Sequence, residues 1–155
     1  MELFAQRTGT RLVHVPYAGG AAAVADLVAG RTQLAFLNVA TVLPQVRSGA
    51  LRAIAVSSPA IYPSLPEVPT VKTSLPDFQG GSWHGFVGPK GMPAPLLDRI
   101  HAALAAALRA PEVAERLIRI GFTVEATSRA DFAARIEREF AGWRNVVQAA
   151  GLAAD

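Results

Sequence analysis

A regular alternation of short apolar runs and helix-patterned stretches constrains what this chain can fold into more than any other feature. Residues 20–29 and 41–48 carry apolar side chains at helical spacing, and a glycine follows each stretch. Apolar runs of strand length flank them at 11–15, 33–37 and 51–56. Strands and helices that alternate at this spacing predict an α/β fold of βαβ units, with parallel strands joined by helical crossovers.

The glycine pair Gly19-Gly20 lies where the first predicted strand leads into the first crossover helix. Ligands of parallel sheets bind at the carboxyl ends of the strands. The first N–H groups of a helix have no partner within the helix and bear partial positive charge. Because glycines leave this place uncrowded, and Ala21 and Ala22 follow them, the loop is suited to a small anion.

Phosphate is excluded as that anion. A nucleotide-hydrolase loop needs a Lys-Ser/Thr pair where Ala21-Ala22 stands, and a dinucleotide loop needs three spaced glycines. A carboxylate requires only a few N–H donors. Two interpretations stay open from the loop alone: a carboxylate site, or a plain tight turn that lets helix and strand pack.

The second half of the chain predicts a different organisation. Five prolines in residues 57–82 indicate a long ordered connection rather than a core element. A strand is expected at 82–87, a brief strand at 122–125, and helices after Pro95, Pro111 and Ser128. Aspartate at 131 is an imperfect capping-box partner for the serine at the start of the last helix.

Composition excludes several functions. The net charge is +3 at pH 7, but the arginines are spread singly, so the clustered cations that nucleic acid requires are absent from the sequence. There is no cysteine, which excludes disulfides and thiolate–metal sites. No apolar run is long enough to span a bilayer, and the first residues lack the pattern of a secretory signal.

No catalytic or metal-binding group is predicted, and no cofactor is expected. The three histidines lack metal-ligand spacing. Ser57-Ser58 lacks the glycines of a nucleophile elbow, and the paired acids 112/115 and 137/139 are expected on solvated helix faces. The sequence therefore favours a binding protein over an enzyme.

The order of short motifs resembles one family. Val-Pro-Tyr-Ala-Gly-Gly (15–20) is followed by Leu-Ala-Phe-Leu-Asn (34–38), by the run 43–56 and by Leu-Pro-Glu-Val-Pro-Thr-Val (65–71), and the match continues through 83–93 and 111–117. These motifs are similar to those of the substrate-binding proteins of tripartite tricarboxylate transporters, the Bug (TctC-like) family. The resemblance spans essentially the whole chain.

The resemblance implies a periplasmic-binding-protein-like (type II) fold of two α/β lobes that close on a small organic carboxylate. Such proteins lie in the periplasm and deliver their ligand to membrane permease subunits. Backbone N–H groups of glycine-rich loops hold one carboxylate. The ligand-binding residues that the resemblance implies here are Tyr17, Ala18, Gly19, Gly20, Ala21, Ala22, Asn38 and Thr41.

Family members are about twice as long, and the chain resembles their second half. Residues 1–77 are then expected to form most of lobe two, and 78–155 the returning segment of lobe one, so the architecture is incomplete. We expect the isolated chain to bind poorly unless a missing N-terminal half or self-association completes it. Two alternatives stay open: a truncated non-binding remnant, and a small α/β enzyme that uses the Gly19-Gly20 loop for an anionic substrate.

Overall fold

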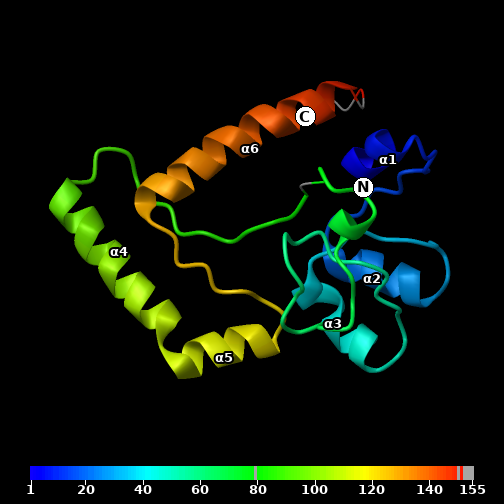
Figure 1. Ribbon diagram of the computed structural model, residues 1–155, viewed down its shortest axis with the longest axis horizontal. Coiled ribbons are helices and arrows are strands. Elements are labelled where there is room, and N and C mark those ends of the chain that lie inside the picture. Colours follow the sequence, from blue (N-terminus) through cyan, green and yellow to red (C-terminus); the bar gives the residue numbers. More distant parts are fainter. Residues whose placement is uncertain (79, 150, 152–155) are drawn as a thin grey trace.

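The regular structure of the chain is helical (Figure 1). A computed structural model describes residues 1–78, 80–149 and 151. Its helices are α1 (Glu2–Thr8), α2 (Gly20–Val28), α3 (Val39–Arg47), the short 3-10 helix η1 (Val71–Thr73), α4 (Ala94–Arg109), α5 (Pro111–Arg119) and α6 (Arg129–Ala149). In Figure 1, α1 to α3 gather at one end and α4 lies at the other, while α6 extends from the side of α4 back toward α1. Neither α6 nor any shorter helix of the described chain combines the length and apolarity that crossing a membrane requires.

Local sequence signals place the helix ends as predicted. Gly30 and Gly49 follow α2 and α3 with left-handed backbones at φ 72° and φ 77°, and Pro95 lies in the first turn of α4. At the start of α6, the Asp131 N–H donates to Ser128 Oγ at 3.0 Å, and the Ser128 hydroxyl donates to Asp131 Oδ2 at 2.6 Å. Aspartate therefore serves in this cap although its side chain is shorter than the usual glutamate.

The predicted strands differ from the structure. The runs at 11–15, 33–37, 82–87 and 122–125 form no strand in the part of the chain described. Outside the helices, Val56 and Thr70 form an isolated parallel β-bridge. In this bridge the Val71 N–H donates to the Val56 carbonyl at 2.8 Å. Strand-like residues form a strand only where a neighbouring backbone supplies the hydrogen bonds. These runs lack that neighbour within the described residues.

The core lies between α3 and the proline-rich stretch. Leu43, with 2% of its surface exposed, packs with Val56, Leu65 and Val68. Val71 and Phe78 of the same stretch are also buried. The prediction that residues 57–82 are a connection rather than a core element is therefore wrong. Prolines prevent regular helix there, but the apolar side chains between them remain free to pack.

The end of α5 is fastened to the first half of the chain. The Ser64 hydroxyl donates to the Ile118 carbonyl at 2.5 Å, and the Tyr62 hydroxyl donates to the Gly121 carbonyl at 2.9 Å. Gly121 has φ 93°, and a Cβ there would lie 2.9 Å from the backbone of Ala40. Only glycine fits this turn, because both the backbone conformation and the close approach exclude a side chain.

Candidate functional site

The loop before α2 leaves the helix N-terminus open. Gly19 caps α2 with extended backbone at φ −178°, and no side chain bonds to the cap. Among the described residues, no hydrogen bond is formed by the N–H groups of Gly20, Ala21 or Ala22, while the Ala23 N–H returns to the Gly19 carbonyl at 3.4 Å. Three backbone donors at the positive end of the helix are therefore free to meet an anion.

The start of α3 lies directly beside this helix N-terminus. A Cβ at Gly20 would lie 2.9 Å from Cγ2 of Thr41, whereas a Cβ at Gly19 would meet nothing within 4 Å. Asn38 caps α3, and its carbonyl accepts the Thr41 N–H at 2.9 Å. The close approach of Thr41 therefore requires glycine at position 20 but not at position 19. Two helix N-termini consequently meet at one place, and their partial positive charges add.

Tyr17 fastens the loop to α2. Its hydroxyl donates to Asp26 Oδ2 at 2.9 Å, and Arg31 Nη1 donates to Asp26 Oδ1 at 2.6 Å. The Arg31 hydrogen bond, followed by that of Tyr17, holds the pKa of Asp26 below its usual value. The hydrogen bond to Asp26 raises the pKa of the Tyr17 hydroxyl above its usual value. Asp26 of α2 is therefore the point at which the loop residue Tyr17 and Arg31, beyond the end of the helix, are both held.

A residue far along the chain also reaches this place. The Ser82 hydroxyl donates to Asn38 Oδ1, which joins the segment after residue 80 to the start of α3. Sequence reasoning missed Ser82, because nothing in its local pattern distinguishes it from an ordinary loop serine. It also missed Asp26 and Arg31, whose spacing from Tyr17 becomes meaningful only when the loop folds back onto α2.

The eight residues that the resemblance implies are all exposed or half-buried. Tyr17, Gly20 and Thr41 are half-buried, and the others are exposed: Ala18, Gly19, Ala21, Ala22 and Asn38. The structure brings Gly20 into contact with Thr41, and Thr41 into a hydrogen bond with Asn38. The Tyr17 hydroxyl is instead committed to Asp26.

Other polar groups have structural roles. Trp83 Nε1 donates to Glu139 Oε2 at 2.8 Å, and Arg135 Nε donates to Glu139 Oε1 at 2.8 Å. The Trp83 ring packs edge-on against Phe132 with 4.9 Å between centroids. The prediction that Glu139 lies on a solvated helix face is therefore wrong, because its carboxylate accepts a hydrogen bond from the Trp83 indole N–H. The described residues hold no group of three or more His, Asp or Glu side chains placed for a metal ion.

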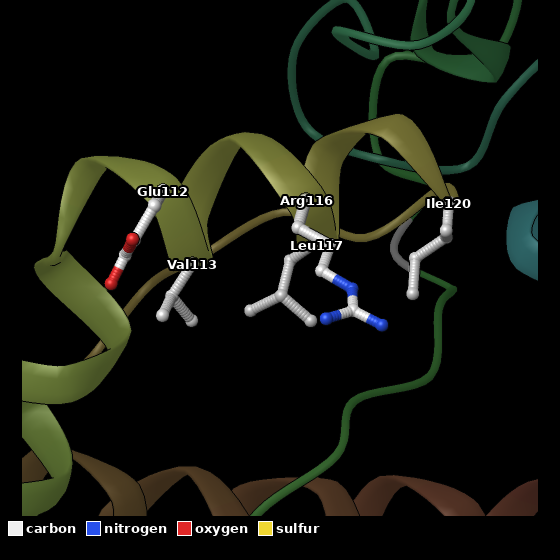
Figure 2. A pocket seen from close by; sticks show the side chains of 5 residues that line it. All are labelled: Glu112, Val113, Arg116, Leu117 and Ile120. Carbon is white, nitrogen blue, oxygen red and sulfur yellow. The ribbon is translucent and has the colours of Figure 1, made fainter.

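An open hollow lies on α5, away from the glycine loop. Its volume is about 490 Å³, and it is open to solvent. In Figure 2 its lining side chains project from one side of the helix: Glu112, Val113, Arg116, Leu117 and Ile120. An open, mostly apolar surface with few converging polar groups lacks the features of an enclosed ligand pocket.

Comparison with known proteins identifies the family. Residues 1–152 match the family described as "Tripartite tricarboxylate transporter family receptor". The chain belongs to this receptor family. It is 34% identical over 147 residues to the UPF0065 protein in the tcbD-tcbE intergenic region of Pseudomonas sp. (strain P51), which covers 94% of this chain and 44% of that protein. The chain thus spans less than half of this relative, within its carboxyl-terminal half.

Two solved structures of other proteins share the fold of this chain. The structure titled "R. palustris Rpa4515 with adipate" superposes with a TM-score of 0.86 at 31% identity, covering 98% of this chain and 51% of that one. Periplasmic binding protein BugD superposes with a TM-score of 0.74 at 30% identity, covering 97% of this chain and 52% of that one. These neighbours confirm the predicted family and the α/β binding-protein fold class, of which this chain is a part.

Proposed function

We propose that this receptor-family chain supplies a carboxylate-binding loop to an extracytoplasmic solute receptor, and that its ligand is a small dicarboxylate. The unpaired N–H groups at the start of α2 support the proposal most directly, since a carboxylate needs a few donors of this kind. A neighbour of 31% identity whose title names adipate adds support for the ligand class.

In this proposal the backbone does the binding. Gly20, Ala21 and Ala22 donate N–H groups to one carboxylate, and Thr41 and Asn38 border it from the start of α3. Gly20 keeps the two helix starts close, since its missing side chain is what Thr41 approaches. A site built from backbone amides and helix dipoles attracts an anion without a cationic side chain. Small residues such as Ala18 and Gly19 at its edge are therefore sufficient for binding.

The family suggests the wider organisation. Residues 1–77 would form most of one lobe, and 78–155 would return to the other, with the Ser82 to Asn38 hydrogen bond at the place where the two meet. The partner would be the membrane permease of a tripartite transporter, and the location would be the periplasm. The family description names a transporter receptor, and the BugD title names a periplasmic binding protein.

Binding is favoured over catalysis at this loop. A general base or nucleophile would need a polar side chain with a usable proton affinity beside the bound anion. The Tyr17 hydroxyl is bonded to Asp26, which raises its pKa, so it remains protonated at neutral pH. His14 lies three residues before Tyr17, and its Nδ1 atom is 3.4 Å from Oε1 of Glu2.

Amide chemical-shift titration of the 155-residue chain with adipate tests the site. We expect millimolar binding, on the order of 4 kcal/mol, because water competes with the ligand on the open side of the loop. The largest shifts should occur at the amides of Gly20, Ala21 and Ala22. The Ala22→Asp variant places a resident carboxylate on the same helix start, which stabilises α2 but repels the ligand. The isosteric control is Ala22→Asn.

The comparison of these two variants separates binding from folding. Ala22→Asp should abolish the adipate-dependent shifts without lowering the melting temperature, while Ala22→Asn should retain them. Adipate-dependent shifts spread over unrelated surface amides, or equal titration curves for the two variants, would contradict the proposed site. A monocarboxylate such as hexanoate serves as the ligand control, and equal affinity for it would contradict the dicarboxylate class.

A further inference from the structure

The side chain at the N-cap of α3 is turned away from its own helix. An asparagine at this position ordinarily accepts an N–H of the first helical turn through its side-chain oxygen. Asn38 is the N-cap of α3, yet its side chain forms no such bond. Its Oδ1 atom instead accepts the hydroxyl of Ser82, which lies 44 residues further along the chain. A distant residue therefore sets the orientation of this amide.

The orientation of the Asn38 amide decides which of its two polar groups a ligand can meet. The oxygen of a side-chain amide only accepts hydrogen bonds, and its NH2 group only donates them. Ser82 occupies the oxygen, while no residue that the structure describes accepts a hydrogen bond from the NH2 group. Asn38 is exposed, so this NH2 group is accessible to a ligand.

This donor lies beside the free N–H groups of the glycine loop. Thr41, whose N–H donates to the Asn38 carbonyl, is also the residue whose methyl group lies against Gly20. The backbone N–H groups of Gly20, Ala21 and Ala22 can only donate, as the Asn38 NH2 group does. The Thr41 hydroxyl can donate or accept, so it does not distinguish between the two kinds of ligand group.

The acidic side chain of α2 is already occupied. Neither α2 nor α3 has an acidic residue in its first turn. Further along α2, Asp26 accepts the Tyr17 hydroxyl at Oδ2 and Arg31 Nη1 at Oδ1. Because both carboxylate oxygens are bonded, and Arg31 offsets the charge, Asp26 is a poor partner for a cationic group on a ligand.

Ser82 is held in place by its neighbour in the chain. Trp83 Nε1 donates to Glu139 Oε2 of α6 at 2.8 Å, and the Trp83 ring packs edge-on against Phe132 with 4.9 Å between centroids. These contacts fix the backbone next to Ser82 on α6, while its hydroxyl reaches Asn38 at the start of α3. The serine therefore approaches the amide from a support that is independent of α3.

We propose that Ser82 is a specificity-determining residue that acts through Asn38. By holding the amide oxygen, it leaves the NH2 group for the ligand, so that donors from both helix starts face the bound group. Donors favour carboxylate oxygens and disfavour an ammonium group next to them. The preferred ligands are dicarboxylates without an amino group beside the carboxylate. This inference rests on the proposed carboxylate site and adds a selectivity to it.

Amide chemical-shift titrations with adipate and with 2,5-diaminoadipate test this role. The second compound carries an ammonium group beside each carboxylate, so either end presents one to Asn38. We expect the parent chain to prefer adipate, and Ser82→Ala to reduce that preference by about 5-fold, because the released oxygen can accept from the ammonium group. Ser82→Thr keeps the hydroxyl and should keep the preference. Ser58→Ala is the matched control, since its hydroxyl donates to the Ala60 carbonyl at 2.7 Å, and it should also keep the preference.

Two further measurements separate the role of Ser82 from folding and from the anion site. Ser82→Ala should not lower the melting temperature, because the released Asn38 oxygen can cap α3. In an Asn38→Ala background, Ser82→Ala should no longer change the preference. Absence of shifts at the amides of Gly20, Ala21 and Ala22 would contradict the carboxylate site, and this inference with it. Shifts there with equal preference in the parent and in Ser82→Ala, or with a parent that prefers 2,5-diaminoadipate, would overturn the role of Ser82 alone.

Discussion

The contact between Gly20 and Thr41 gives the sharpest prediction about the glycine loop. The Gly20→Ala variant adds a methyl group that would lie 2.9 Å from Thr41 Cγ2, well inside van der Waals contact. Threonine is β-branched and stiff at χ1, so its methyl group cannot turn aside freely. The two helix starts must then move apart, and the pairing of their positive ends is weakened.

The magnitude follows from two opposing effects. Overpacking of this kind costs about 1–3 kcal/mol. Replacement of a helical glycine by alanine contributes up to about 1 kcal/mol of stability, and less at the first helical position. We therefore expect Gly20→Ala to lower the free energy of unfolding by about 1 kcal/mol, which for a chain of this size lowers the melting temperature by about 2–4 °C.

A double-mutant cycle measured by urea denaturation isolates the contact. Thr41→Ser removes the clashing methyl group and keeps the hydroxyl, so the Gly20→Ala/Thr41→Ser double variant should recover about 1 kcal/mol of coupling energy. Gly19→Ala is the control, since a Cβ there meets nothing within 4 Å and its backbone is extended. A coupling energy near zero, or a Gly20→Ala variant more stable than the parent, would refute the reasoning.

Four further predictions concern the core, the loop and the second half of the chain. Leu43→Ala should lower the free energy of unfolding by about 2–5 kcal/mol in urea denaturation, because this leucine is fully buried. Ultraviolet titration should show Tyr17 ionising above pH 10, its usual value, and Asp26→Asn should lower that pKa toward 10. The Tyr17 bond therefore stabilises the fold below pH 10 and is lost as pH rises through the raised pKa. Asp26, whose pKa is depressed, stabilises the fold above its usual pKa of 3.8, and that contribution is lost as pH falls through the lowered value in an acid-denaturation series. Gly85→Ala should destabilise the chain by about 1–3 kcal/mol in thermal unfolding, since its Cβ would overlap the Phe132 ring.

Local interactions explain which parts of the structure the sequence predicted. The left-handed Gly30 and Gly49 after α2 and α3, Pro95 in the first turn of α4 and the Ser128–Asp131 cap each depend on residues within one helical turn of one another. The same is true of the free N–H groups at Gly20, which follow from the start of a helix and from nothing more distant.

Contacts between distant residues explain the failures. The prolines of 57–82 predicted a connection, yet Leu65 packs against Leu43 of α3 in the core. The strand predictions failed for a related reason, because a strand forms by pairing, and pairing depends on backbone that the run itself does not contain. Ser82 escaped detection because its partner Asn38 lies 44 residues earlier.

The sequence by itself determined the family, the helices with their ends, and the small-residue loop that begins α2. Each of these depends on residue types at short spacing, which a linear pattern records. Only the tertiary structure decided that Thr41 lies against Gly20 and that Asp26 and Arg31 fasten Tyr17. It also decided that 52–55 and 82–87 form no backbone hydrogen bond to any residue that the structure describes. The physical reason is that packing and strand pairing join backbone and side chains that the folded chain, rather than their spacing in the sequence, brings together.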